Sequence, residues 1–263
     1  MSAELRELTD LTRSLKRRVS LSDSSDWTAS TAAKAPAPVA PSKSASVADS
    51  VSKPVSKPVS KNAERVGTLA ELAEKIKACR ACELGDYRIQ AVPGVGSPTA
   101  KVMFIGEGPG FQEDHKGEPF VGRSGQLLDK IMESIGLSRK TVYIANIVKC
   151  HPMKNPKDPE SHGNDRPPTP EEMAACRGWL EAQIRTIKPK VIVTLGAVPA
   201  RALLADDTPI TKIRGKWRTY DPGEGLPAIK LLPTFHPAAL LRNPDLKRDV
   251  WTDMKNLKEE LSR

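Results

Sequence analysis

The spacing of hydrophobic residues divides the chain into three parts. Between residues 4 and 18, four leucines recur at steps of three and four, which predicts a short amphipathic helix within residues 1–27. Residues 28–64 lose this period and consist largely of Ala, Pro, Ser, Val and Lys, with a repeated Val-Ser-Lys-Pro unit. Such a composition buries too little apolar surface to offset the entropy of ordering, so we expect a disordered linker.

Residues 65–263 show the pattern of a folded α/β domain. Short apolar runs predict buried strands at 101–108, 141–149, 190–196 and 228–235. Helical spacing of apolar residues predicts helices at 68–78, 125–136, 170–187, 197–205 and 245–261. Because strands that alternate with helices form parallel sheets covered on both faces, we expect a three-layer α/β/α fold around a central, mostly parallel four-stranded sheet.

A glycine-rich segment follows the first predicted strand, where sheets of this kind bind their ligands. The segment GEGPG at 106–110 matches neither nucleotide-binding glycine pattern, G-x-G-x-x-G or G-x-x-x-x-G-K-[ST], which argues against a nucleotide-dependent enzyme. Its glycines Gly106 and Gly108 would instead bring the backbone close to a ligand, and Glu107 presents a carboxylate.

Three further side chains near strand ends suit a planar, polar ligand. Asn146 offers a paired donor and acceptor that can read the edge of a base. Phe120 offers a flat apolar face, and His236 offers an imidazole that can donate toward developing negative charge. Each residue alone is equally consistent with an ordinary structural role. Their joint appearance around successive strand ends favours a ligand site.

The four cysteines predict a metal centre. Cys79 and Cys82 form a C-x-x-C pair, and Cys150 and Cys176 follow at a distance in the sequence. Disulfides are a poor use of cysteine in a reducing cytosol. Four thiolates suit either a structural zinc ion or a [4Fe-4S] cluster, and the spacing leaves both open, beside the alternative of unligated buried cysteines.

Charge adds a class of partner. The chain carries 41 Lys+Arg against 32 Asp+Glu, a formal net charge of +9, which favours an anionic partner and nucleic acid first. No stretch approaches the length of about 20 apolar residues that a membrane helix needs, and the first residues lack the apolar centre of a secretion signal. We therefore expect a cytoplasmic protein that associates with the nucleoid by binding DNA.

Five motifs, together with the upstream C-x-x-C, resemble the iron-sulfur, family 4 uracil-DNA glycosylases. They are GEGPGFQED at 106–114, EPFVGRSGQLLDK at 118–130, IANIVKCHP at 144–152, PTPEEMAACRGWL at 168–180 and HPAALLRNP at 236–244. The resemblance covers nearly all of residues 66–261. It implies a uracil-DNA glycosylase-like fold, hydrolysis of the N-glycosidic bond of deoxyuridine to free uracil and an abasic site, and initiation of base excision repair. It also implies a monomer that acts on single- or double-stranded DNA.

The resemblance also implies roles for individual residues. Phe120 would stack on a uracil flipped out of the helix, Asn146 would read its N3 and O4 edge, and Glu113 would exclude the methyl group of thymine. His236 would hydrogen-bond the uracil oxygen that gains charge, and Glu107 would position the attacking water. The remaining positions are assigned to DNA contact (Ser124 at a helix N-terminus, Leu240 as a wedge in the base stack, Arg242 at the backbone) and to the [4Fe-4S] cluster (Cys79, Cys82, Cys150 and Cys176).

The sequence departs from the family in two places. Gly108 stands where the family usually has Ala, and about ten residues are added within 151–168. A related branch carries a histidine in this region that bonds covalently to the deoxyribose, and His162 lies here without the Lys-Arg-Arg run of that branch. Two alternatives to the glycosylase follow: a covalent uracil-DNA binding protein and a noncatalytic iron-sulfur DNA-binding protein. The N-terminal helix is expected to dock a partner or to be a fraying extension.

Overall fold

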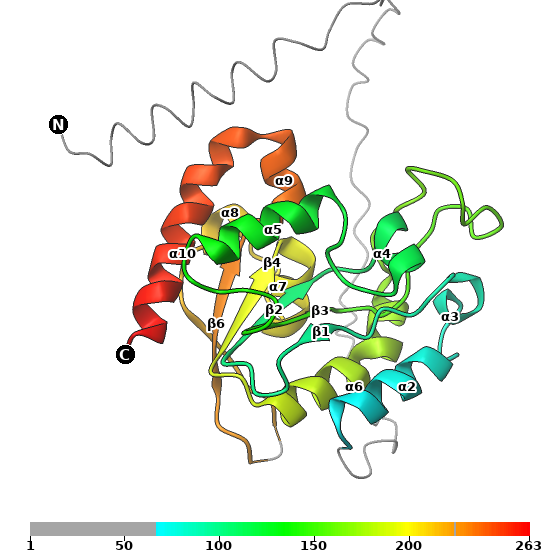
Figure 1. Ribbon diagram of the computed structural model, residues 1–263, viewed down its shortest axis with the longest axis horizontal. Helices are drawn as coiled ribbons and strands as arrows, with labels where there is room; N and C mark the ends of the chain where they lie inside the picture. The colour runs from blue at the N-terminus through cyan, green and yellow to red at the C-terminus, as the bar shows by residue number, and fades with distance from the viewer. Residues whose placement is uncertain (1–66, 224) are drawn as a thin grey trace, which may run out of the picture. The chain divides into compact units, whose positions relative to one another are not determined.

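The computed structural model describes residues 67–223 and 225–263, which hold a six-stranded mixed sheet (Figure 1). The helix predicted within residues 1–27 and the linker predicted at 28–64 lie outside the described residues. No helix in the described ranges is long and apolar enough to cross a membrane.

The four predicted strands form the parallel centre of the sheet. They are β2 Val102–Gly106, β3 Tyr143–Asn146, β4 Val191–Leu195 and β6 Ile229–Thr234, in the order β3-β2-β4-β6. Two short antiparallel strands, β1 Val95–Gly96 beside β3 and β5 Arg218–Tyr220 beside β6, extend it at the edges. The predicted count of four strands is therefore corrected to six. The added strands are too short to show a period of two in the sequence.

The five predicted helices are all present. They are α2 Leu69–Ala78, α5 Arg123–Glu133, α6 Pro170–Ile187, α7 Ala197–Leu204 and α10 Lys247–Leu261. The described chain has further short helices of three to six residues: α3 Leu84–Tyr87, α4 Phe111–Lys116, α8 Ile210–Ile213, α9 Pro237–Arg242 and the 3-10 turn η1 Pro244–Leu246. Helices this short bury too few residues to reveal a helical period.

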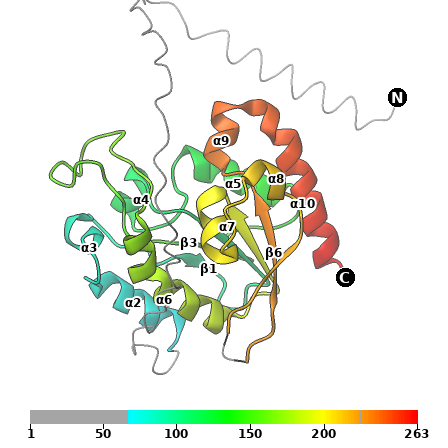
Figure 2. The same ribbon diagram turned by 180° about the vertical axis from the view of Figure 1, so that it is seen from behind.

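Apolar side chains on the two faces of the sheet pack against different helices. Along β2, Met103 and Ile105 join the cluster that contains the inner face of α6, while Val102 and Phe104 join the cluster of α5 and α10. Figures 1 and 2 show α2 and α6 side by side on the first face and α10 on the other. The predicted three-layer α/β/α architecture is thus confirmed.

Candidate functional site

The carboxyl ends of β2 and β3 bring two of the predicted residues side by side. Gly106 and Asn146 are register partners at the ends of these strands. A Cβ atom on Gly106 would overlap the amide oxygen of Asn146 and lie 2.6 Å from Cζ of Phe120. The Phe120 ring centroid is in turn 5.5 Å from that of His236, which follows β6. Residues from four segments of the chain therefore meet at one edge of the sheet.

Asn146 has an unused hydrogen-bonding group. Its side chain is buried, with 1% of the residue exposed, and its Oδ1 has no hydrogen-bond partner among the described residues. An unpaired buried acceptor costs about 1–3 kcal/mol, so it is kept where a ligand supplies the donor. The main-chain carbonyl of Asn146 accepts a 2.8 Å hydrogen bond from Nζ of Lys149, which holds this strand end in place.

The hydrogen bond at Nδ1 sets the tautomer of His236. This residue caps the N-terminus of α9, and its Nδ1 accepts from the backbone N–H of Ala238 at 3.1 Å. Burial, assisted by the positive charge of Arg242, lowers the pKa of His236 to about 4. The imidazole is therefore neutral at physiological pH, and its proton lies on Nε2, where it is available to a ligand.

Two carboxylates stand near the glycine-rich loop. Glu107 directly follows Gly106 and is half-buried, and this burial raises the pKa of its carboxyl group. Oε1 of Glu113 accepts from the backbone N–H groups of Val121 (2.9 Å) and Gly122 (3.1 Å). Glu113 thus holds the turn after Phe120. Its expected contact with the C5 edge of a base stays a prediction.

The segment that contains Leu240 differs from the prediction. It forms the short helix α9 and not an open loop, and Leu240 is only 2% exposed, in the apolar cluster that also contains Phe120 and Leu128. In this structure Leu240 is therefore packed inside the protein, and its wedge role stays a prediction. The helical turn faces Leu240 inward and leaves Leu241 41% exposed, with Arg242 exposed beside it.

The first turn of α5 carries the remaining predicted DNA contact. Ser124 is half-buried there, next to the exposed Arg123. The neighbouring Gly125 packs directly against the carbonyl of Phe120, because any Cβ at this position would overlap that oxygen. The helix that presents Ser124 is thus fixed to the loop that presents Phe120.

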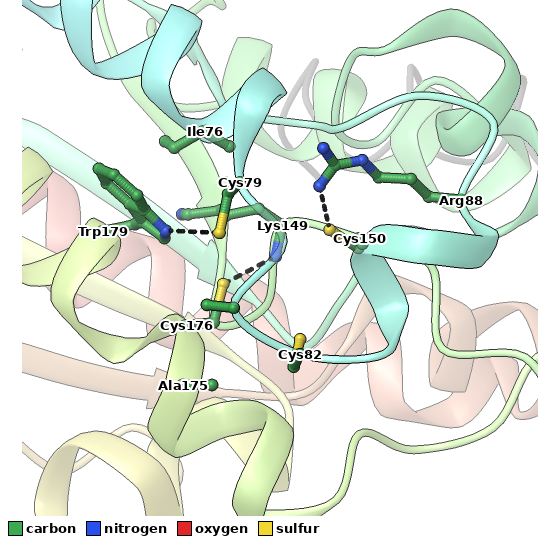
Figure 3. Close-up of a pocket in the computed structure, with 11 residues that line it drawn as sticks. Ile76, Cys79, Cys82, Arg88, Lys149, Cys150, Ala175, Cys176 and Trp179 are labelled. Carbon is green, nitrogen blue, oxygen red and sulfur yellow. Dashed lines mark hydrogen bonds between the residues drawn. The ribbon is translucent and has the colours of Figure 1, made fainter.

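The four cysteines line one pocket (Figure 3). Three N–H groups point at their sulfur atoms. Arg88 Nη1 lies 2.8 Å from Sγ of Cys150, Trp179 Nε1 lies 3.4 Å from Sγ of Cys79, and the backbone N–H of Lys149 lies 3.3 Å from Sγ of Cys176. Donors of this kind stabilise negative charge on sulfur.

A buried cation borders the same pocket. Lys149 is 1% exposed, and its ammonium donates to two neutral acceptors, the Asn146 carbonyl and Oε1 of Gln183 (2.7 Å). Burial lowers the pKa of Lys149 to about 8, while nearby Cys176 and Cys150 oppose the shift. Burial also raises the pKa of Cys176 to about 12, so the thiol is protonated unless a metal displaces its proton. Metal-bound thiolates would supply the negative charge that a buried ammonium needs.

The described side chains do not form a site for a single metal ion. No group of three or more His, Cys, Asp or Glu in residues 67–223 and 225–263 is placed to hold one. Structural zinc needs its sulfur ligands about 2.3 Å from one point.

The added segment within 151–168 packs over α4. Met153 and Asp165 pair across it as an isolated β-bridge, and Nε2 of the buried His151 lies 2.6 Å from Oδ1 of Asp165. The ring of His162 lies 4.2 Å, between centroids, from the ring of Phe111 at the start of α4. The insertion is thus folded against the helix that carries Glu113.

Lys149 and Arg139 were missed by the sequence analysis. Lys149 is a charged residue at the end of a predicted buried strand and directly before a cysteine, a combination that could have indicated a special role. Arg139, which donates to the carbonyls of Pro119 and Phe120, lies too far along the chain for any local pattern to link it to Phe120.

Comparison with known proteins gives a family match over most of the described chain. A family model for the uracil DNA glycosylase superfamily matches residues 93–255. The type-4 uracil-DNA glycosylase of Sulfurisphaera tokodaii is 41% identical over 200 residues, covering 73% of this chain and 84% of the relative. Those of Thermotoga maritima (42% over 196 residues; 73% and 94%) and Archaeoglobus fulgidus (38% over 196 residues; 73% and 92%) are similarly related.

Proposed function

This chain belongs to the type-4 uracil-DNA glycosylases, and we propose that the side chains at the carboxyl ends of β2, β3 and β6 form its active site. The enzyme is a hydrolase of N-glycosyl bonds that acts in base excision repair. The observation that carries the site proposal is the packing of Gly106 between the amide of Asn146 and the ring of Phe120. An amide and an aromatic ring that lie this close together suit the recognition of a pyrimidine base.

Recognition requires that the uracil leave the base stack, because a base inside a duplex cannot reach a buried site. The Phe120 ring then stacks on the extruded base, and the Asn146 amide pairs with its N3–H and O4. Cytosine carries an amino group at C4 and no proton on N3, so it would leave the Asn146 amide mispaired. Specificity follows from the cost of unpaired buried polar groups.

Bond cleavage places negative charge on the base and positive charge on the sugar. His236 donates its Nε2 proton in a hydrogen bond to the uracil oxygen that gains charge, while its Nδ1 stays bonded to the α9 backbone. A preorganised donor of this kind is worth about 10²- to 10³-fold in rate. Glu107, ionised, orients the attacking water and offsets the sugar's positive charge, as carboxylates do in glycoside hydrolases.

Contact with DNA falls to residues around the site. Leu241, exposed on α9, takes the wedge role first assigned to Leu240, and Arg242 lies beside it to meet a phosphate. Ser124 in the first turn of α5 is a second phosphate contact. These three residues, with Gly106 and Gly108 lining the base pocket, complete the proposed substrate surface.

The four cysteines hold a [4Fe-4S] cluster in this proposal. The donor set supports it: four sulfur atoms around one pocket, three N–H groups directed at them, and a buried ammonium that needs anionic thiolates. When bound, the cluster supplies a covalent link between α2, the end of β3 and α6, and no step of the hydrolysis needs an electron from it.

The covalent alternative gains no support from the insertion. Its candidate nucleophile, His162, packs against the ring of Phe111 in a tilted arrangement, and the similar relatives named above are type-4 enzymes. The test is to incubate the protein with uracil-containing single- and double-stranded DNA without added metal or nucleotide. Alkali-labile abasic sites and free protein support hydrolysis, while a protein–DNA adduct that survives denaturation supports the covalent reaction.

We propose that residues 1–64 lie outside the catalytic unit of this monomeric, cytoplasmic enzyme and serve DNA affinity or partner recruitment. Residues 1–65 carry 11 Lys+Arg against 7 Asp+Glu, which adds nonspecific, salt-sensitive attraction to phosphate. A protein that starts at Asn62 should keep the parental single-turnover rate at saturating enzyme and lose DNA affinity mainly at low salt. Loss of cleavage with the fold and the cluster intact would place this segment in the catalytic unit.

A further inference from the structure

Phe120 has an unusual backbone conformation for its residue type. Its φ is +56°, in the left-handed region that residues with a Cβ atom rarely adopt, and its side chain is 6% exposed. Such a conformation persists only where the surrounding structure enforces it, and it concentrates at functional sites. The contacts that enforce this conformation therefore also determine the orientation of the Phe120 ring.

Arg139 holds the chain from the carbonyl side. Its Nη1 donates to the carbonyl of Pro119 at 3.0 Å, and its Nη2 donates to the carbonyl of Phe120. Its Nε donates to Oδ1 of Asp129 on α5 at 2.7 Å, which fixes the plane of the guanidinium. One planar fork thus grips two successive carbonyls, a geometry that a lysine cannot reproduce.

Glu113 holds the same segment from the amide side. Its Oε1 accepts from the N–H groups of Val121 and Gly122. The peptide group between Phe120 and Val121 is therefore gripped at both ends, its carbonyl by a guanidinium and its N–H by a carboxylate. This two-sided clamp leaves the backbone at Phe120 little freedom to relax to negative φ.

We propose that Arg139 is a positioning residue for base recognition, which keeps Phe120 in its left-handed conformation so that the ring faces the uracil. The inference rests on the proposed stacking role of Phe120. Arg139 itself touches no reacting atom, and it acts only through the Phe120 backbone. Removing it allows the segment to relax and moves the ring away from the base.

The test is a double-mutant cycle in single-turnover excision. Arg139→Gln should lower the single-turnover excision rate by about 10²-fold, the cost of a misplaced binding group. In a Phe120→Ala background the same change should cost less than about twofold, because the ring it positions is gone. Arg139→Lys should lose nearly as much as Arg139→Gln. Arg177→Gln, which removes an exposed arginine pair with Glu181 on α6, is the control and should keep parental activity.

The outcomes distinguish the stacking role of Phe120 from the positioning role of Arg139. If Phe120→Ala excises uracil at the parental rate, the stacking role fails. If Phe120→Ala is impaired and Arg139→Gln costs the same factor in both backgrounds, Arg139 is structural and the proposal is overturned. Parental activity of Arg139→Lys also overturns it, and this variant serves if Arg139→Gln does not fold.

Discussion

The amide oxygen of Asn146 and the ring of Phe120 approach each other so closely across Gly106 that a single carbon atom added to Gly106 would collide with both. Asn146 comes from the end of β3 and Phe120 from the loop before α5, and both groups contact the end of β2 at Gly106. Glycine is thus required at residue 106 for the amide and the ring to keep these positions in the proposed base site.

Gly106→Ala should abolish most uracil excision without unfolding the protein. The added methyl group must displace either the amide or the ring, and a misplacement of this size costs about 10²-fold in rate. Gly178→Ala on α6 is the matched control, because no atom lies within 4 Å of a Cβ there and alanine favours a helix. Single-turnover assays and thermal unfolding of both variants would show this, and a fully active Gly106→Ala would refute the packing.

The pH dependence of excision should contain no histidine step near pH 6.5. Since the pKa of His236 is lowered to about 4, the imidazole stays neutral as the pH falls from 8 toward that value. Burial raises the pKa of Glu107, so its carboxylate is lost as pH falls through a value above 4.5, and activity should fall with it. The residual activity of Glu107→Gln should not show this fall in activity at acid pH. A step near pH 6.5 that persists in Glu107→Gln would contradict the neutral-histidine assignment.

Anaerobically purified protein should be brown and contain about four iron atoms per chain. Cys176→Ser should lose this absorption, because its sulfur is one of the four that line the pocket. Iron analysis and visible spectra provide the measurement. A colourless, zinc-loaded protein with full activity would exclude the cluster.

Leu241→Ala should reduce excision from double-stranded DNA more than from single-stranded DNA. A wedge fills the gap left by a flipped base, and a single strand has no duplex stack to refill. Leu240→Ala should instead lower thermal stability, with a cost of about 2–5 kcal/mol typical of a buried leucine. Equal losses on both substrates for Leu241→Ala would remove it from the wedge role.

The parts of the fold that local sequence determines were predicted well. Helix α6 has the expected bounds because Thr169 and Glu172 cap each other's backbone and Pro170 begins the first turn. The edge strands β1 and β5 were missed because two or three residues carry no periodicity. The burial of Leu240 was not predicted because His236 and Pro237 resemble a loop, whereas they begin a helix whose turn faces Leu240 inward.

The site itself was predictable only in part. The residues at strand ends follow from the topology of a parallel sheet, which accounts for Asn146, Glu107 and His236. The left-handed backbone of Phe120 and its clamp by Arg139 depend on contacts across 19 residues of sequence, which no local pattern encodes.

The most direct test of the assigned active site is uracil excision by Asn146→Ala and His236→Ala, measured in single turnover on uracil-containing DNA with cluster absorbance recorded for each preparation. Both variants should keep the cluster and lose most activity, with His236→Ala falling by about 10²- to 10³-fold. Asn146→Ala should also discriminate less well between uracil and cytosine. If both variants excise uracil at the parental rate, the residues at these strand ends are not the active site.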